Sequence, residues 1–189
     1  MIIRELSIDE IKQTYKEHLK ADFPADELKP LGVILRSYRR GDYLCIGAYD
    51  GGEMAGYAFF VFDDRTCLLD YYAVVRGRRG QGLGTEFLSR LGTSAIRSRC
   101  DIMLIEVEDP LHSPVKDSTV RLKRLEFYLK CGAVRTGAQA SVFGVDYILL
   151  EFPLNGEPHT REEAADAYGK LYASQLPKLL FKHQILIRT

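Results

Sequence analysis

Residues 76–98, with the sequence RGRRGQGLGTEFLSRLGTSAIRS, decide the fold of this chain of 189 residues. They follow a strand-length apolar run, residues 67–75 (CLLDYYAVV), and their second half carries apolar residues at helical spacing. The apolar positions are Leu83, Phe87, Leu88, Leu91, Ala95 and Ile96. The pattern predicts a strand, a glycine-rich turn and an amphipathic helix in direct succession.

The turn has the composition of a phosphate-binding loop. Gly80, Gly82 and Gly84 remove side chains where the helix begins, so backbone N–H groups can approach an anion near the positive end of the helix dipole. A nucleotide-hydrolase loop would place Lys and then Ser or Thr after its last glycine, but Thr85 and Glu86 follow Gly84. A dinucleotide fingerprint fits poorly because its glycine spacing is absent. Taken alone, the turn is equally typical of an exposed basic loop.

Two motifs resemble those of one known family. Residues 79–84 (RGQGLG) resemble the R/Q-x-x-G-x-G/A signature of the GNAT superfamily of acyl-CoA-dependent N-acetyltransferases, in which this loop binds the CoA pyrophosphate. Phe127-Tyr128, followed by Gly132, resembles the F-Y-x-x-x-G that ends the last core helix of that family. The resemblance covers about residues 1–152. It implies an α/β fold with a central mixed, mostly antiparallel sheet, splayed between strands 4 and 5 and flanked by helices.

The resemblance also implies a cofactor site, with acetyl-CoA as co-substrate and no metal. The family places the pantetheine arm between strands 4 and 5, and the N–H of Val74 is the candidate donor to the oxyanion. Arg121 stands where the family often has Asn, and we expect it to face a CoA phosphate instead. The residues expected to bind the cofactor are Ala73, Val74, Val75, Arg79, Gly80, Gln81, Gly82, Leu83, Gly84, Thr85 and Arg121.

Candidate catalytic residues follow from the same resemblance and from the acidic residues of the strands next to the glycine-rich turn. Tyr128 is the family's usual acid for the departing thiolate, although a tyrosine on the inner face of a helix is more often a packing residue. Glu106 and Asp70 are candidate bases, or anchors for an ammonium group, and no single base can be named. Glu108, two residues from Glu106, and Asp109 are equally well explained by salt bridges with Arg97, Arg99 or Lys116. The clustered acids predict a cationic amine acceptor.

Composition excludes several classes of protein. Lys plus Arg number 26 and Asp plus Glu number 26, so no net charge favours nucleic acid or an anionic membrane as a partner. The four cysteines form no C-x-x-C pair, which argues against zinc and disulfides and predicts packing residues. We expect a cytoplasmic protein, since no membrane span or signal peptide is recognisable.

The resemblance implies an N-acetyltransferase domain over residues 1–155. The remaining residues, 156–189, are predicted to form a C-terminal helical extension. Capping boxes at residues 7–10 (SIDE) and 160–163 (TREE) begin helices, and D-G-G at 50–52 predicts a hairpin. The acids at 22, 26 and 27 are expected in a solvated loop, and Asp117 or Ser118 is expected to cap a helix. The extension is apolar enough to pack on the core or on a second subunit, which would make a homodimer.

Three functions fit these patterns. The first is an N-acetyltransferase that moves an acetyl group from acetyl-CoA to a primary amine of a small molecule or peptide, directly in a ternary complex. The second is a catalytically silent acyl-CoA-binding module, which would need the loop but neither Tyr128 nor the acids. The third, a nucleic-acid-binding module built on the loop arginines, lacks interleaved aromatic residues and fits least. The identity of the acceptor cannot be derived from the sequence, because fold does not fix function.

Overall fold

The computed structural model describes the whole chain except residues 26, 93–94, 111–114 and 156. The chain divides into two compact units, one of Met1–Val61 and Asp70–Leu91 and the other of Phe62–Leu69 and Gly92–Thr189. Strand β4 (Thr66–Val74) gives its first residues to the second unit and its last residues to the first. Neither unit is therefore one continuous segment of the sequence.

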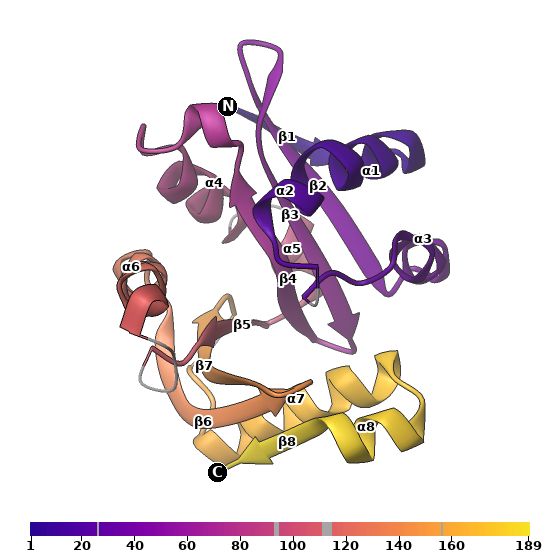
Figure 1. The fold of residues 1–189 in the computed structure, drawn as a ribbon, viewed down its shortest axis with the longest axis vertical. Helices are drawn as coiled ribbons and strands as arrows, with labels where there is room; N and C mark the ends of the chain where they lie inside the picture. Colours follow the sequence, from indigo (N-terminus) through magenta and orange to yellow (C-terminus); the bar gives the residue numbers. More distant parts are fainter. Residues whose placement is uncertain (26, 93–94, 111–114, 156) are drawn as a thin grey trace. The chain divides into compact units, whose positions relative to one another are not determined.

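Eight strands form one sheet in the order β1-β2-β3-β4-β5-β7-β6-β8 (Figure 1). Strands β4 and β5 (Ile102–Glu108) are parallel, and their register joins residues 66–68 to residues 102–104 at the start of both strands. The other registers that the structure describes are antiparallel. This mostly antiparallel sheet with one short parallel contact confirms the predicted mixed α/β class.

The first unit begins with a strand and a capped helical segment. The Ser7 side chain accepts the N–H of Glu10 and the Glu10 side chain accepts the N–H of Ser7, which confirms the predicted capping box. The segment consists of α1 (Ile8–Thr14), the π-helical turn η1 (Tyr15–Leu19) and α2 (Lys20–Asp22). The other elements are β1 (Ile2–Glu5), α3 (Leu31–Arg40), β2 (Tyr43–Asp50), β3 (Glu53–Asp63), the 3-10 turn η2 (Arg76–Arg78) and α4 (Leu83–Gly92).

The core of the first unit fixes the helix that follows the glycine-rich turn. Phe87 and Leu88 of α4 are buried together with large aromatic side chains of β3, among them Tyr57, Phe59 and Phe60. The ring of Phe87 stacks on that of Tyr72 at 5.4 Å between centroids. Burying such side chains stabilises the unit by about 1.5 to 3 kcal/mol each. The start of α4 is therefore held in a fixed place relative to β4.

The second unit contains the remaining elements. They are α5 (Ala95–Arg99), β5, α6 (Val115–Lys130), β6 (Val134–Val142), β7 (Val145–Pro153), α7 (Arg161–Gln175), α8 (Lys178–Gln184) and β8 (Ile185–Arg188). The long helix predicted after the glycine turn falls on α4 and α5, and Thr93 and Ser94 lie outside the described residues. Helix α6 already includes Asp117 and Ser118, so their predicted role as caps is wrong.

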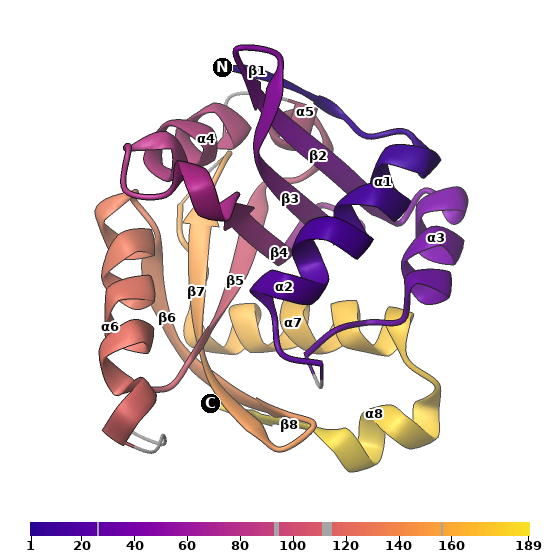
Figure 2. The same cartoon turned by 45° about the horizontal axis from the view of Figure 1, so that its top comes forward.

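The C-terminal segment is helical as predicted up to Gln184 but ends in a strand. The capping box of Thr160 and Glu163 starts α7, which buries Ala164, Ala165, Tyr168, Leu171 and Tyr172. Residues 185–188 form β8, which pairs antiparallel with β6, so the prediction of a wholly helical tail is wrong. Figure 2 shows α7 across the face of this part of the sheet, with β8 at its edge.

Candidate active site

The glycine-rich turn lies in the first unit between β4 and α4. Gly80 and Gly82 both have a φ of +77°, a left-handed conformation that side chains other than glycine rarely adopt. A Cβ atom on either glycine would meet nothing within 4 Å. The space beside these two backbone positions is therefore open to a ligand, at the N-terminal end of a ten-residue helix.

Two arginines of the turn are anchored on one buried acid. Arg79 donates from its terminal nitrogen to Oδ1 of Asp22 at 2.7 Å, and Arg76 donates to the same oxygen at 3.1 Å. The hydroxyl of Tyr57 donates to the other carboxylate oxygen at 2.9 Å. Only 3% of the Asp22 side chain is exposed, so its predicted place in a solvated loop is wrong. Sequence reasoning missed this residue because its arginine partners lie more than fifty positions away and Tyr57 lies 35 positions away.

A second set of contacts joins the end of β4 to the turn and to β3. Nε of Arg79 donates to the carbonyl of Val74 at 2.9 Å, and the hydroxyl of Tyr72 donates to the carbonyl of Gly84 at 2.5 Å. The N–H of Val75 donates to the carbonyl of Ala55 at 2.9 Å, so this amide is bound within the protein. The turn is therefore preorganised by contacts from both ends. The expected cofactor roles of Ala73, Val74 and Val75 stay predictions.

Asp70, one candidate base, lies on β4 in the first unit and already has a cation as partner. Nζ of Lys29 lies 2.6 Å from its Oδ1, and the hydroxyl of Tyr43 donates to its other oxygen. The Asp70 side chain is 7% exposed. Burial, followed by the charge of Asp70, raises the pKa of Tyr43 well above its usual value, so this phenol remains a donor. The Asp70 carboxylate is thus bound within the first unit by one ammonium group and one phenol.

Glu108 and Arg121 pair with each other in the second unit. The Arg121 guanidinium lies 3.0 Å from one oxygen of Glu108, and the Arg124 guanidinium lies 2.7 Å from the other. A salt bridge was one of the explanations expected for Glu108, and the partners that the structure describes are arginines of α6. The side chain of Lys116, one of the expected partners, lies outside the described residues. The cofactor contact expected of Arg121 stays a prediction, and Arg121 would have to make it while paired.

Glu106, the other candidate base, is held by two tyrosines of α7. The hydroxyl of Tyr172 donates to Oε1 of Glu106 at 2.6 Å, and the hydroxyl of Tyr168 donates to the same oxygen. No local pattern in the sequence connects Glu106 with tyrosines that lie 62 and 66 positions away. The only signal was the position of both tyrosines, four residues apart, on the apolar side of a capped helix.

Tyr128, the candidate acid, is buried near the end of α6. Burial raises its pKa to about 12, and its ring lies 5.1 Å from that of Phe127 in an edge-to-face arrangement. The helix ends as the motif predicts, with Gly132 at a φ of +100°. A phenol with this pKa is fully protonated near neutral pH and can donate a proton to a thiolate. Its burial suits a packing residue equally well.

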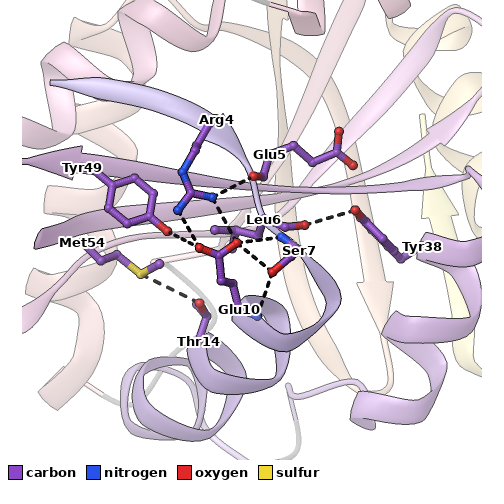
Figure 3. Close-up of polar contacts among 9 residues, drawn as sticks. All are labelled: Arg4, Glu5, Leu6, Ser7, Glu10, Thr14, Tyr38, Tyr49 and Met54. Carbon is purple, nitrogen blue, oxygen red and sulfur yellow. Dashed lines mark hydrogen bonds and ion pairs between the residues drawn. The ribbon is translucent and has the colours of Figure 1, made fainter. Parts of the chain in front are cut away.

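A cleft of about 340 Å³ lies in the first unit beside the capping box of α1. Its lining residues are Glu10, Gln13, Thr14, Glu17, His18, Tyr49 and Met54. Figure 3 shows Arg4 and Tyr49 reaching Glu10, and Arg4 donates to the two Glu10 oxygens at 3.0 and 2.5 Å. These bonds, with those from Ser7, lower the pKa of Glu10 to about 2. None of the residues predicted for the site lines this cleft.

The predicted residues are distributed over both units. Asp70, residues 73–75 and the glycine-rich turn belong to the first unit, whereas Glu106, Arg121 and Tyr128 belong to the second. Within the described residues, no group of three or more His, Cys, Asp or Glu side chains is arranged to hold a metal ion. Cys45, Cys67 and Cys100 are buried free thiols and Cys131 is half-buried, which confirms their prediction as packing residues.

The comparisons with known proteins identify the family. A model of the acetyltransferase (GNAT) family matches residues 8–132, which include both the glycine-rich turn and the Phe-Tyr motif. The chain belongs to this GNAT family. It is therefore an acyl-CoA-dependent acetyltransferase by descent, as the resemblance implied. The sequence matches none of the curated proteins with which it was compared.

Solved structures share the GNAT fold over most of the chain. A protein from Bacteroides thetaiotaomicron assigned to the GNAT family has a TM-score of 0.70 and 19% identity, covering 91% of this chain and 96% of that one. The ribosomal-protein-S18-alanine N-acetyltransferase of Escherichia coli has a TM-score of 0.61 and 18% identity, covering 84% and 96%. An aminoglycoside 6'-N-acetyltransferase in complex with coenzyme A has a TM-score of 0.59 and 17% identity, covering 84% and 100%. In the described part of this GNAT chain, no helix is long and apolar enough to cross a membrane.

Proposed function

We propose that this chain moves an acetyl group from acetyl-CoA to a primary amine of a small molecule or peptide, directly and in a ternary complex. The observation that carries the proposal is the glycine-rich turn, with two left-handed glycines and open space beside them at the start of α4. The N–H groups of residues 81–85 bind the CoA pyrophosphate there. The anchoring of Arg79 on Asp22 supports this role, because a preorganised loop loses less entropy on binding.

Tyr128 protonates the CoA thiolate in this proposal. Its pKa of about 12 keeps the proton on the phenol until a strong base forms beside it. The acceptor gives the proton of its ammonium form to water and attacks the thioester carbonyl as a free amine. The C–S bond then breaks and the Tyr128 proton goes to sulfur. The proton that the nitrogen loses as the amide forms returns to the Tyr128 phenolate through water. None of the cysteines is needed as an acyl carrier, because the acetyl group passes directly to the amine.

The acceptor in this proposal is a cationic amine. Asp70 is paired with Lys29, and Glu108 is paired with Arg121 and Arg124, so the charge preference is proposed from the half-buried carboxylate of Glu106. The names of the related structures include enzymes that act on a ribosomal-protein alanine and on aminoglycosides, which are both amine acceptors. We also propose that the protein forms a homodimer. The mass of the protein in solution tests this part of the proposal.

A panel of primary amines tests the proposed function. The full chain is incubated with acetyl-CoA and 1,4-diaminobutane, an alanine amide or an aminoglycoside, and the release of free CoA thiol is followed with a thiol reagent. We expect amine-dependent release together with a product heavier by one acetyl group. If acetyl-CoA binds in calorimetry but no amine accelerates thiol release, the alternative of a catalytically silent acyl-CoA-binding module holds.

A further inference from the structure

The arginines of the glycine-rich turn are paired with acids of the first unit. Arg79 and Arg76 both donate to Oδ1 of Asp22, at 2.7 and 3.1 Å. Arg78, the third arginine, forms an ion pair with Asp50. Two guanidinium groups share the one carboxylate of Asp22, so one positive charge remains there, while charge-assisted hydrogen bonds fix the direction of both side chains. The protein therefore holds these arginines in place before any ligand arrives.

Asp22 occupies a position that the local sequence does not favour. It is the last residue of α2, and a carboxylate at the C-terminal end of a helix meets the negative end of the helix dipole. The π-helical turn η1 comes directly before α2, and such turns are frequent at functional sites. A residue that breaks a local rule in this way is expected where contacts distant in the sequence, or function, select it.

Burial makes the Asp22 carboxylate a fixed point. Only 3% of its side chain is exposed, and the hydroxyl of Tyr57 on β3 donates to its Oδ2 at 2.9 Å. Burial, followed by the charge of Asp22, raises the pKa of Tyr57 well above its usual value, so the phenol remains a donor near neutral pH. Asp22 thus joins the buried part of β3 to the arginines of the turn.

Arg79 connects Asp22 with the end of β4 and with the open backbone of the turn. Its Nε donates to the carbonyl of Val74 at 2.9 Å, while its terminal nitrogen is held by Asp22. One side chain therefore fixes the end of β4 relative to the turn. The next residue is Gly80, the first of the two left-handed glycines with open space beside them. Donors that are preorganised in this way lose less entropy when they bind an anion.

We propose that Asp22 is a positioning residue for the cofactor and acts through Arg79 and Arg76 on the glycine-rich turn. The arginines brace the turn, and the backbone N–H groups of residues 81–85 bind the CoA pyrophosphate of the proposed function, on which this inference rests. The sign of one effect separates this role from direct electrostatic attraction. Removal of a negative charge beside an anion site strengthens anion binding if charge dominates. It weakens binding if the carboxylate holds the site in shape.

Matched variants test this role. Asp22→Asn removes the charge and keeps the size of the side chain. Arg79→Lys keeps the charge of the turn but loses the planar fork that reaches Asp22 and the Val74 carbonyl together, and it is the second variant in case Asp22→Asn is unstable. The control is Asp50→Asn, which removes the 43% exposed acid paired with Arg78. Calorimetry measures the affinity of each protein for CoA and for dephospho-CoA, which keeps the diphosphate, and thermal melting measures stability.

We expect Asp22→Asn to weaken the binding of CoA and of dephospho-CoA by the same factor, about tenfold, as the loss of one charge-assisted hydrogen bond predicts. Arg79→Lys should weaken both in the same direction, and Asp50→Asn should stay within about twofold of the wild type. In turnover with the amine panel, Asp22→Asn should raise the KM for acetyl-CoA and leave kcat within about twofold. A merely structural role would lower the melting temperature without this split between KM and kcat.

The direction of the change in affinity decides between the outcomes. An unchanged or tighter affinity for CoA in folded Asp22→Asn overturns the positioning role and leaves the proposed function intact. If that variant does not fold, an unchanged affinity in Arg79→Lys has the same meaning. A wild type that binds neither CoA nor dephospho-CoA contradicts the proposed function itself, and the positioning role is then wrong as well.

Discussion

Gly82 shows how one backbone torsion prepares a binding loop. Its φ of +77° is accessible to glycine. A β-branched residue there would be strained by about 1 to 2 kcal/mol, or the backbone of the loop would change its conformation to relieve the strain. We therefore expect Gly82→Val to weaken CoA binding at least tenfold while the core of the first unit keeps its stability. Calorimetry with CoA and a thermal melt measure the two quantities.

Gly77 provides the control for that substitution. It lies in the neighbouring turn η2 at an ordinary φ, and a Cβ there meets nothing within 4 Å. Gly77→Val should therefore leave CoA affinity within about twofold. Equal affinities in wild type and Gly82→Val would show that the loop does not bind the pyrophosphate through its backbone.

Tyr128 is expected to act in the transition state. Replacing it with Phe should lower kcat by about a hundredfold or more, because a general acid contributes that much, while the affinity for acetyl-CoA changes little. Its pKa of about 12 means that the protonated, acid form prevails at every lower pH. The wild-type rate should therefore show no alkaline loss assignable to this phenol below about pH 11. A variant with full activity on the acceptor would return Tyr128 to the role of a packing residue.

At the scale of elements, the N-terminal cap of α1 links stability to pH. The hydrogen bond from Arg4, with those from Ser7, lowers the pKa of Glu10 from 4.5 to about 2. A lowered pKa stabilises the folded state above the unfolded-state value, and this contribution is lost as the pH falls from about 4.5 towards 2. We expect Glu10→Gln to be less stable than the wild type at pH 7, with the difference shrinking over that acid range.

Asp9 is the matched acid for this experiment. It lies beside Glu10 in the first turn of α1, but its side chain is 91% exposed. Chemical unfolding of Asp9→Asn should give nearly the wild-type free energy at each pH, since exposed ion pairs contribute little. A constant difference between wild type and Glu10→Gln from pH 7 to pH 2.5 would contradict the assignment to the Glu10 carboxylate.

Elements defined by neighbouring residues could be predicted from the sequence. Both capping boxes and the glycine-rich turn depend on residues a few positions apart. Strand β8 could not be predicted in this way. Its apolar residues fit a helix equally well, and only the partner strand β6, far back in the sequence, selects the extended form.

The same distinction applies to the candidate site. The loop glycines and Tyr128 belong to short motifs that can be recognised in the sequence, and their roles stay predictions. The anchoring of two loop arginines on Asp22 and the tyrosine contacts of Glu106 join residues more than fifty positions apart, and no local pattern encodes them. The prediction for Glu108 was half right for this reason: a salt bridge forms, with arginines of α6 that the local sequence did not indicate.

At the scale of the whole molecule, residues 157–189 belong to the second unit. Removing this segment would take away the buried side chains of Tyr168 and Leu171 and expose the surface that they now cover. It would also leave one edge of β6 unpaired. We expect the shortened protein to melt at a clearly lower temperature or to aggregate, because each buried side chain contributes about 1.5 to 3 kcal/mol. Thermal melting and light scattering measure the effect.

Two substitutions in β8 refine this experiment. Ile187 is half-buried and lies close to Gly169 of α7, whereas Leu186 is exposed. Ile187→Lys should lower the melting temperature by several degrees, and Leu186→Lys should have almost no effect. The same melting temperature for the wild type, both variants and the shortened protein would show that the segment is dispensable for stability.

The order of β6 and β8 along the chain has a consequence during synthesis on the ribosome. Strand β6 emerges before β7, α7 and α8, and the strand that covers its second edge comes after all of them. Until β8 has emerged, a nascent chain carries β6 with hydrogen-bonding groups available to any other extended chain nearby. Slow translation through residues 143–184 would therefore lengthen the time during which neighbouring nascent chains can pair, and molecular chaperones would be most useful in that interval.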